Sequence, residues 1–169
     1  MEGRLAEFSG FYAAYRDQCL RAVLASTGDR HAAEEHVAEA FARAWAAWGK
    51  VRRYQAPQAW VVRTALNAGV SSWRKRRREV PLEPGQLPEP GTVGDPAGAE
   101  SVDAVMEVLA RLPRRQREIV ALRFFLDLDT ATTAEVLGIA PGTVTAHLAR
   151  AMTVLRDELR LAAPREAQS

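Results

Sequence analysis

The sequence is poor in the residues that build disulfide and metal-bound frameworks. Its 169 residues include one cysteine, Cys19, which excludes an internal disulfide framework and a cysteine-cluster zinc site. No uncharged apolar stretch approaches the ~20 residues of a membrane-spanning helix, and the first residues lack the pattern of a signal peptide. We therefore expect a soluble, cytoplasmic protein with no metal and no cofactor.

Catalytic motifs are missing as well. The run from His31 to His36 (HAAEEH) has neither of the zinc-helix spacings, H-E-x-x-H and H-x-x-E-H, and histidines five residues apart point to different faces of a helix. The sequence has no G-x-x-x-x-G-K-[ST] phosphate loop and no G-x-S-x-G turn. The protein is therefore predicted not to be an enzyme.

Charge is distributed unevenly along the chain, although the net charge is only +2. Residues 1–78 carry 14 Lys and Arg against 7 Asp and Glu, residues 79–100 carry five acids and no base, and residues 101–169 carry nine of each. Residues 79–100 also hold five of the nine prolines and four of the eleven glycines, which oppose both helix and sheet. This pattern predicts a polyanion-binding first domain, a flexible acidic linker and a second domain.

Apolar residues recur at helical steps of three and four, and no alternating strand pattern is convincing. The fold class is therefore predicted to be all-α. Gly28-Asp29 separates the first two helices, with Asp29 as the N-cap of the second, Gly49 is expected to end that second helix, and Pro57 suits the first turn of a third. The predicted buried stripes are Phe8, Phe11, Tyr12, Tyr15, Cys19, Ala22 and Val23; Val37, Ala40, Phe41, Ala44, Trp45 and Trp48; and Val62, Leu66, Val70 and Trp73.

The second half has the layout of a helix-turn-helix. Helices are predicted up to residue 112 and from 114 to 126, followed by a short helix at 132–137, a turn at Gly138 and a longer helix opened by Pro141. An ordinary helical hairpin has the same layout, so that alternative stays open. The residues that would face a DNA major groove are Thr143, Ala146, His147 and Arg150.

The strongest functional pattern lies on the third helix, opposite its apolar stripe. Polar residues recur there and run into five consecutive cations, residues 74–78. Five like charges exceed what a helix dipole needs, and a phosphate backbone would relieve their repulsion. Asn67 is able to bond a base edge, while Tyr54, in the preceding loop, stays open as a stacking residue. The predicted nucleic-acid face comprises Arg63, Asn67, Ser71, Arg74, Lys75 and Arg76.

Three carboxylates, Glu34, Glu35 and Glu39, lie on the exposed side of the second helix. Acid–base catalysis by carboxylates needs a cleft and perturbed pKa values, and nothing in the sequence indicates a cleft. A solvated face is the default interpretation, and a contact surface for a basic partner is the more specific one.

Two blocks of sequence resemble bacterial RNA polymerase sigma factors of the sigma-70 family, in the extracytoplasmic-function (ECF) group. The first is GDRHAAEEHVAEAFARAWAAW with WVVRTALNAGVSSWRKRRRE, and the second is LPRRQREIVALRFFLDLD with LGIAPGTVTAHLARAMTVLRDEL. The junction SSWRKRRREVP is most similar to the actinobacterial SigE-type branch. The resemblance implies a sigma region 2 domain at 1–78, a linker at 79–100, a sigma region 4 domain at 101–162 and a tail at 163–169.

The resemblance also implies a function. The chain would bind core RNA polymerase and direct promoter-specific initiation, docking on the clamp helices of the largest subunit through Glu34, Glu35 and Glu39. Its other implied partners are the polymerase flap, promoter DNA and an anti-sigma factor. Residues 50–78 would recognise and help to melt the −10 element through Tyr54, Arg63, Asn67, Ser71, Arg74, Lys75 and Arg76. The helix-turn-helix would read the −35 element through Thr143, Thr145, Ala146, His147 and Arg150.

The recognition helix departs from the family pattern. Where the family commonly has a basic–Ser–basic set, this chain has Thr145, Ala146 and His147, which leaves Arg150 as the permanent cation. Loss of a bidentate arginine costs about 1–3 kcal/mol of base discrimination, so we expect an unusual −35 element or weaker duplex affinity. Two alternatives remain: a stand-alone helix-turn-helix regulator, and a degenerate paralogue that docks on polymerase without initiating.

Overall fold

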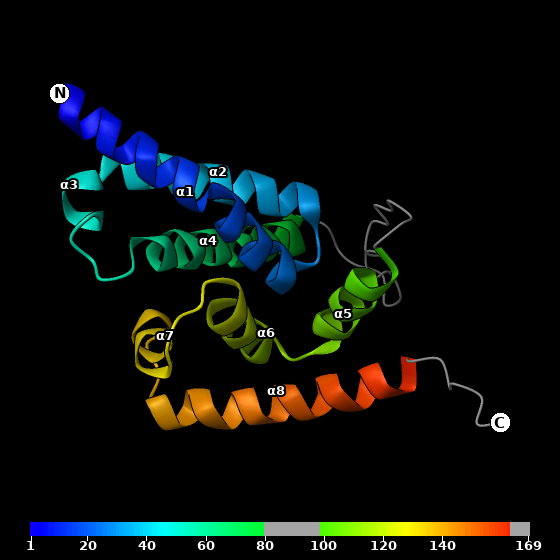
Figure 1. The fold of residues 1–169 in the computed structure, drawn as a ribbon. Coiled ribbons are helices and arrows are strands. Elements are labelled where there is room, and N and C mark those ends of the chain that lie inside the picture. The colour runs from blue at the N-terminus through cyan, green and yellow to red at the C-terminus, as the bar shows by residue number, and fades with distance from the viewer. Residues whose placement is uncertain (80–98, 163–169) are drawn as a thin grey trace.

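The computed structural model describes residues 1–79 and 99–162, with side chains at 1–69 and 103–161, and all regular structure in these ranges is helical (Figure 1). The all-α prediction is therefore confirmed. The predicted linker falls on residues 80–98 and the predicted tail on 163–169, which lie outside the described residues. No helix within the described ranges is long and apolar enough to cross a membrane.

Nine elements follow one another along the chain in the described ranges. The first domain consists of α1 (Glu2–Thr27), α2 (Arg30–Ala46), the one-turn α3 (Trp48–Val51) and α4 (Pro57–Glu79). The second consists of α5 (Ala99–Arg111), α6 (Arg114–Val120), a π-helical turn η1 (Ala121–Phe125), α7 (Thr130–Leu137) and α8 (Pro141–Ala162). The single helix predicted for 114–126 is thus two consecutive elements, α6 and η1.

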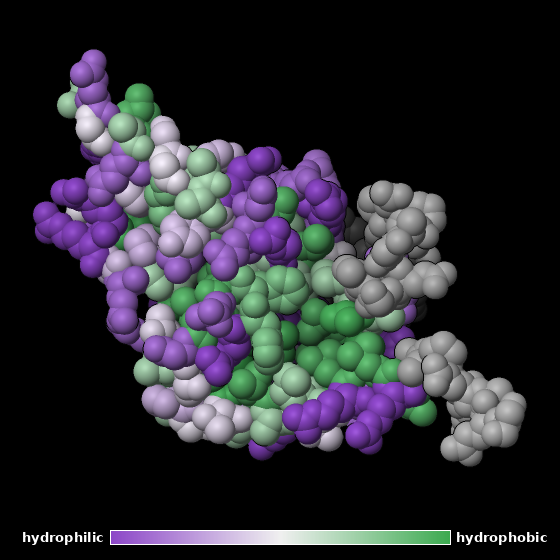
Figure 2. Space-filling view, viewed as in Figure 1, coloured by the Kyte–Doolittle hydropathy of each residue, from purple (hydrophilic) through white to green (hydrophobic). Residues whose placement is uncertain are grey.

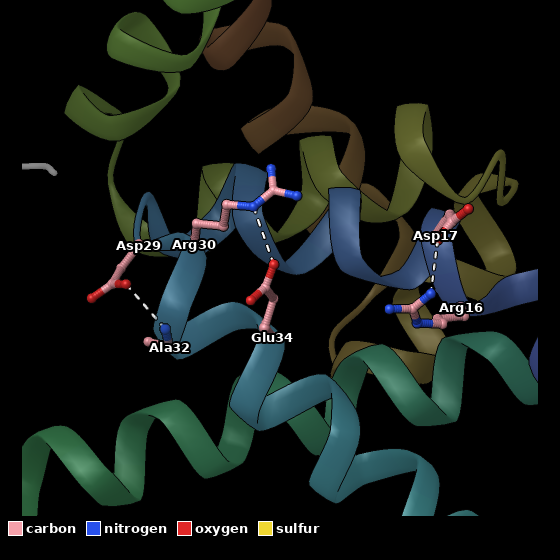
Figure 3. Close-up of polar contacts among 6 residues, drawn as sticks. All are labelled: Arg16, Asp17, Asp29, Arg30, Ala32 and Glu34. Carbon is pink, nitrogen blue, oxygen red and sulfur yellow. Dashed lines mark hydrogen bonds and ion pairs between the residues drawn. The ribbon is translucent and has the colours of Figure 1, made fainter. Parts of the chain in front are cut away.

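The chain breaks between α1 and α2 as the residue types predict. Gly28 ends α1 in the left-handed conformation (φ 71°), where a side chain would be strained, and its N–H donates to the Leu24 carbonyl. The carboxylate of Asp29 then caps α2, its Oδ1 accepting from the Ala32 N–H at 3.0 Å (Figure 3). The predicted cap is therefore confirmed.

The prediction for Gly49 is wrong. Helix α2 ends at Ala46, and Gly49 lies inside α3. The backbone leaves the helix at Ala47 (φ −102°, ψ 17°), ahead of the glycine. The cause is tertiary packing, because this bend brings the Trp48 ring onto the rings of Phe8 and Phe11, with centroids 5.2 and 4.9 Å apart.

The core of the first domain lies where α1, α2 and α4 pack together. Most of the predicted stripe is buried, and Trp48 is only 3% exposed. The burial prediction is wrong for two residues: Tyr12 is 40% exposed and Trp45 is 37% exposed, and both lie at the rim of the cluster. The side chains of Val70 and Trp73 lie outside the described residues.

The second domain has two small apolar clusters, both resting on α8. One joins α5, α6 and α8. The other closes the helix-turn-helix, where Ala134 of α7 packs with Ile119 and Val144. Gly138 ends α7 with φ 65°, so the predicted tight turn is confirmed.

The two domains pack against each other rather than standing apart (Figure 1). Helix α1 contacts η1, α5 and α6, and α4 contacts α7. The largest apolar cluster crosses the boundary, because Leu122, Leu126 and Leu128 belong to the same core as the first-domain residues. Figure 2 shows apolar surface running through the middle of the molecule between the first domain and α8.

Candidate nucleic-acid and protein interfaces

The acidic surface of α2 is exposed at all three predicted carboxylates. Glu34 accepts from Arg30 Nε at 3.1 Å (Figure 3), and Glu39 pairs with Arg43, so each is partly neutralised by an arginine on the same helix. Glu35 has no ion pair within the described part of the chain. It is therefore the most available of the three carboxylates for a basic partner.

The predicted nucleic-acid face lies on the solvent side of α4. Arg63 and Asn67, one turn apart, are both exposed, while Val62 and Leu66 on the opposite side are buried. Helix α4 runs without a break to Glu79, so the helical spacing on which the rest of the predicted face depends is maintained. The side chains of Ser71, Arg74, Lys75 and Arg76 lie outside the described residues.

The loop between α3 and α4 is held at its start by α1. Trp48 is almost fully buried, and its indole Nε1 donates to Glu7 Oε2 at 3.4 Å. Arg52, which follows α3, donates from Nη1 to the same oxygen at 3.2 Å. Tyr54 stands in the loop beyond them, 40% exposed. Sequence reasoning missed Glu7, because it lies 41 and 45 residues from its partners and no local pattern marks it.

A second contact from α1 lies where α4 begins. The buried Cys19 thiol points at the Gln58 carbonyl, with 3.8 Å between Sγ and O. Burial raises the pKa of Cys19 to about 12, because the desolvated thiolate is unfavourable. Cys19 is thus a protonated packing residue, as its place in the apolar stripe predicts.

A buried histidine lies at the contact between α2, which exposes the carboxylates, and α4, which exposes Arg63 and Asn67. His36 of α2 is 5% exposed, and its Nδ1 has no hydrogen-bond partner within the described residues. Gly69 of α4 faces the ring, where a β-carbon would sit 3.5 Å from Cδ2. His31 is exposed, and the described ranges hold no group of three or more metal-ligating side chains.

The helix-turn-helix presents a sparsely charged surface. Thr143, Thr145, Ala146 and Arg150 are exposed on α8, and His147 is half-buried. The Thr145 hydroxyl donates back to the Pro141 carbonyl at 3.2 Å. Since Nδ1 of His147 is closed off from solvent, the Nε2 edge is the part of the ring that remains to meet a ligand.

Two sets of polar contacts stabilise the helices next to α8 in the helix-turn-helix domain. Asp129 Oδ1 caps α7 by accepting from the Thr132 N–H at 2.7 Å, and these hydrogen bonds hold the pKa of the Asp129 carboxyl below its usual value. On α6 the buried Glu118 is paired with Arg114 and Arg115, at 2.8 and 3.0 Å. Sequence reasoning did not single out Glu118, although its spacing of four from Arg114 indicates such a pair.

The fold and its surfaces define a class of protein. A helix bundle exposes carboxylates on α2 and the side chains of Arg63 and Asn67 on α4, and a helix-turn-helix domain is packed beside it. Exposed groups of these two kinds suit a helical protein that binds both nucleic acid and a protein partner.

Comparison with known families agrees with this class. The sigma-70 region 2 family matches residues 11–79, and the sigma-70 region 4 family matches residues 103–155. The RNA polymerase sigma-E factor of Streptomyces coelicolor is 33% identical over 160 residues, which cover 93% of this chain and 88% of that protein. The sigma-E factor of Streptomyces avermitilis is 31% identical over 159 residues, covering 93% and 87%.

A solved structure has the same fold. The sigma factor RpoE from Bartonella quintana, crystallised with the anti-sigma factor NepR, superposes with a TM-score of 0.79 at 23% identity, covering 93% of this chain and 99% of that one. The chain belongs to the sigma-70 family of RNA polymerase sigma factors, in the ECF group. Its function is promoter-specific transcription initiation with core RNA polymerase.

Proposed function

We propose that the three surfaces divide the work of initiation. In this assignment α2 docks on the clamp helices of core polymerase, α4 and the loop before it recognise the −10 element, and α8 reads the −35 element. The region 2 domain is assigned to residues 1–78 and the region 4 domain to 101–162. Catalysis belongs to the polymerase, so the chain acts by binding alone, in the cytoplasm where polymerase and promoter are found.

The observation that supports this assignment best is that α2 and α4, which pack on each other, expose side chains of different kinds. Helices α2 and α4 share one core, yet α2 shows carboxylates to solvent and α4 shows Arg63 and Asn67. A protein partner with basic groups and a DNA strand would therefore be held by one rigid unit. This supports a bundle that fixes −10 DNA relative to the polymerase.

Strand opening follows from differential binding. A face that binds an unpaired strand more tightly than duplex shifts the equilibrium towards the open form by the difference in affinity. The Asn67 amide has both a donor and an acceptor for a base edge, and the Tyr54 ring would stack on an unpaired base.

The polymerase contact rests most heavily on Glu35. Each of its neighbours, Glu34 and Glu39, must give up an arginine on its own helix before it gains a partner's cation. Glu35→Gln is therefore expected to weaken core binding more than Glu34→Gln or Glu39→Gln. Pull-down with core polymerase measures this ranking, and equal losses at all three sites would contradict it.

The first experiment is in vitro transcription with sigma-free core polymerase on fragmented genomic DNA. Discrete 5′ ends that depend on the protein support the proposal and reveal both promoter elements. No new starts, despite a stable complex with core, would instead favour a docking paralogue. A promoter shift without any polymerase complex would favour a stand-alone regulator.

Variants of α4 test the division of roles. Arg63→Ala and Asn67→Ala are expected to reduce permanganate reactivity of the −10 strand while core binding stays within twofold. Arg21→Ala is the matched control, because Arg21 is an exposed arginine on a different helix, α1. Equal loss of core binding and opening would contradict a role in the DNA step.

We also propose a protein partner in addition to core polymerase and promoter DNA. The Bartonella sigma factor with this fold is bound to an anti-sigma factor, and we assign this chain a partner of the same class. Co-purification of a protein with the tagged chain, lost when core polymerase is in excess, is the test.

A further inference from the structure

The turn that ends α3 carries three cations within four residues. Lys50, Arg52 and Arg53 are all exposed. Two buried side chains, Trp48 at 3% and Val51 at 1% exposure, fasten the same turn to the core of the bundle. The three cations therefore stand on a backbone that is held in place, at the end of the bundle where α4 begins (Figure 1).

The three cations differ in whether a carboxylate already balances them. Arg52 donates from Nη1 to both carboxylate oxygens of Glu7, at 3.5 and 3.2 Å. Lys50 and Arg53 have no ion pair among the residues that the structure describes. Arg52 is thus engaged within the protein, and the charges of Lys50 and Arg53 remain for a ligand.

The backbone brings these two charges to one side of the turn. The Arg53 N–H donates to the Lys50 carbonyl at 3.1 Å, so the helical turn continues beyond the last residue of α3. Side chains three residues apart on such a turn lie on the same side, with β-carbons ~5–6 Å apart. Tyr54 follows directly, with its ring 40% exposed. One short turn therefore presents two cations and an aromatic ring.

This combination suits a single nucleic-acid strand. Like charges at this spacing repel each other, and a run of phosphates supplies an anion for each of them. Proteins that bind single strands combine cations along the backbone with aromatic rings that stack on the bases. An acidic protein segment would balance the charges equally well, but it would give the exposed ring of Tyr54 no base to stack on.

We propose that Lys50 and Arg53 bind the phosphate backbone of the unpaired −10 strand, while Arg52 holds the turn on α1 through Glu7. Phosphate contacts position a strand without reading its sequence. The two cations therefore hold the strand in register for the residues that read bases. That this strand is the −10 element rests on the proposed function, whereas the affinity of the turn for single-stranded DNA does not.

The salt dependence of binding tests the proposal. The full chain is titrated into a labelled oligothymidylate, and the affinity is measured by fluorescence anisotropy at several salt concentrations. On a single strand each neutralised phosphate contributes a slope of about −0.7 to the logarithm of affinity against the logarithm of salt. Lys50→Gln and Arg53→Gln should each make the slope shallower by about 0.7. From about 50 to 200 mM salt, the advantage of wild type over each variant should shrink about 2.6-fold.

Two controls separate a defined contact from net charge. Arg52→Gln removes a neighbouring cation of the same turn, and Arg21→Gln removes an exposed arginine on α1. Both should leave the slope at its wild-type value, with circular dichroism showing the same helix content in all variants. Slopes that change as much in Arg52→Gln as in Arg53→Gln would overturn the assignment.

The remaining outcomes distinguish this proposal from the promoter function. A wild-type chain that does not bind the oligothymidylate at about 50 mM salt would overturn phosphate binding by the turn. Wild-type slopes in Lys50→Gln and Arg53→Gln, together with weaker pull-down of core polymerase, would place the two cations on the protein partner instead. Normal transcription starts would then leave the proposed function standing. The expected slope changes without any polymerase-dependent start would refute the promoter role and leave phosphate binding standing.

Discussion

Glu7 offers a quantitative test of how α1 holds the loop that precedes α4. Replacing it with alanine removes the acceptor of the buried Trp48 indole and the partner of Arg52. A buried donor left without a partner costs about 1–3 kcal/mol, and the 3.4 Å distance favours the lower end. The pair with Arg52 has both side chains nearly half exposed, so it adds about 0–1 kcal/mol. We expect Glu7→Ala to lower the free energy of unfolding by about 1–2 kcal/mol.

Glu7→Gln separates the two contributions. The amide oxygen still accepts from the indole, while the charge that attracts Arg52 is lost, so the expected cost is about 0.5 kcal/mol. For a chain of this size 1 kcal/mol corresponds to roughly 2–4 °C in melting temperature. Glu7→Ala should then melt about 2–8 °C below wild type and Glu7→Gln within about 2 °C.

Thermal unfolding followed by circular dichroism measures these shifts. Asp17→Ala is the control, because it removes an exposed ion pair with Arg16 on the same helix and no indole bond (Figure 3). Equal melting temperatures for Glu7→Ala and Glu7→Gln would refute the reasoning, since the indole acceptor would then contribute nothing. Permanganate footprinting of the −10 strand should rank the variants in the same order if the loop reads DNA.

Three further predictions concern single groups. Burial raises the pKa of the Cys19 thiol to about 12, so resistance to urea should fall as pH rises from about 9 towards 12. Cys19→Ala should flatten that dependence, and an unchanged slope would contradict it. The pKa of the Asp129 carboxyl is lowered, so its pH dependence is opposite to that of Cys19: the stabilising effect should be present above the usual carboxyl range and be lost as pH falls below it. Asp129→Asn should remove this loss of stability at acid pH from urea titrations. His147→Arg should strengthen holoenzyme binding to a −35 duplex, by up to about 1–3 kcal/mol where a guanine is within reach, and unchanged filter binding at several promoters would argue against His147 facing DNA.

Much of the fold follows from short-range signals in the sequence. Gly28 and Asp29 act within one turn, as do Pro57 and Gly138, so their roles depend on neighbours that are visible in the sequence. The prediction for Gly49 is wrong because the position of Trp48 is decided by Phe8 and Phe11, which lie 40 and 37 positions away in the sequence. At this position tertiary packing overrides the local tendency of glycine to end a helix.

The candidate surfaces likewise include features that local spacing predicts and contacts that it does not predict. Exposure of Glu35 and Asn67 follows from the helical period, since each lies opposite a buried stripe. The arginine partners of Glu34 and Glu39 are also set by a spacing of four. The role of Glu7 and the packing of Ala25 of α1 in an apolar cluster of the second domain depend on contacts between distant segments, which no periodicity reveals.

Helix α1 joins these two distant contacts in one rod. Glu7 and Ala25 are eighteen residues apart, which on an ideal helix is five full turns and about 27 Å. The carboxylate that steadies the loop and the methyl group that meets the second domain therefore leave the helix in the same direction. One inserted residue between them would rotate the two by about 100° and leave one contact misaligned. The length of α1 is consequently under tighter constraint than the identity of the residues on its outer side.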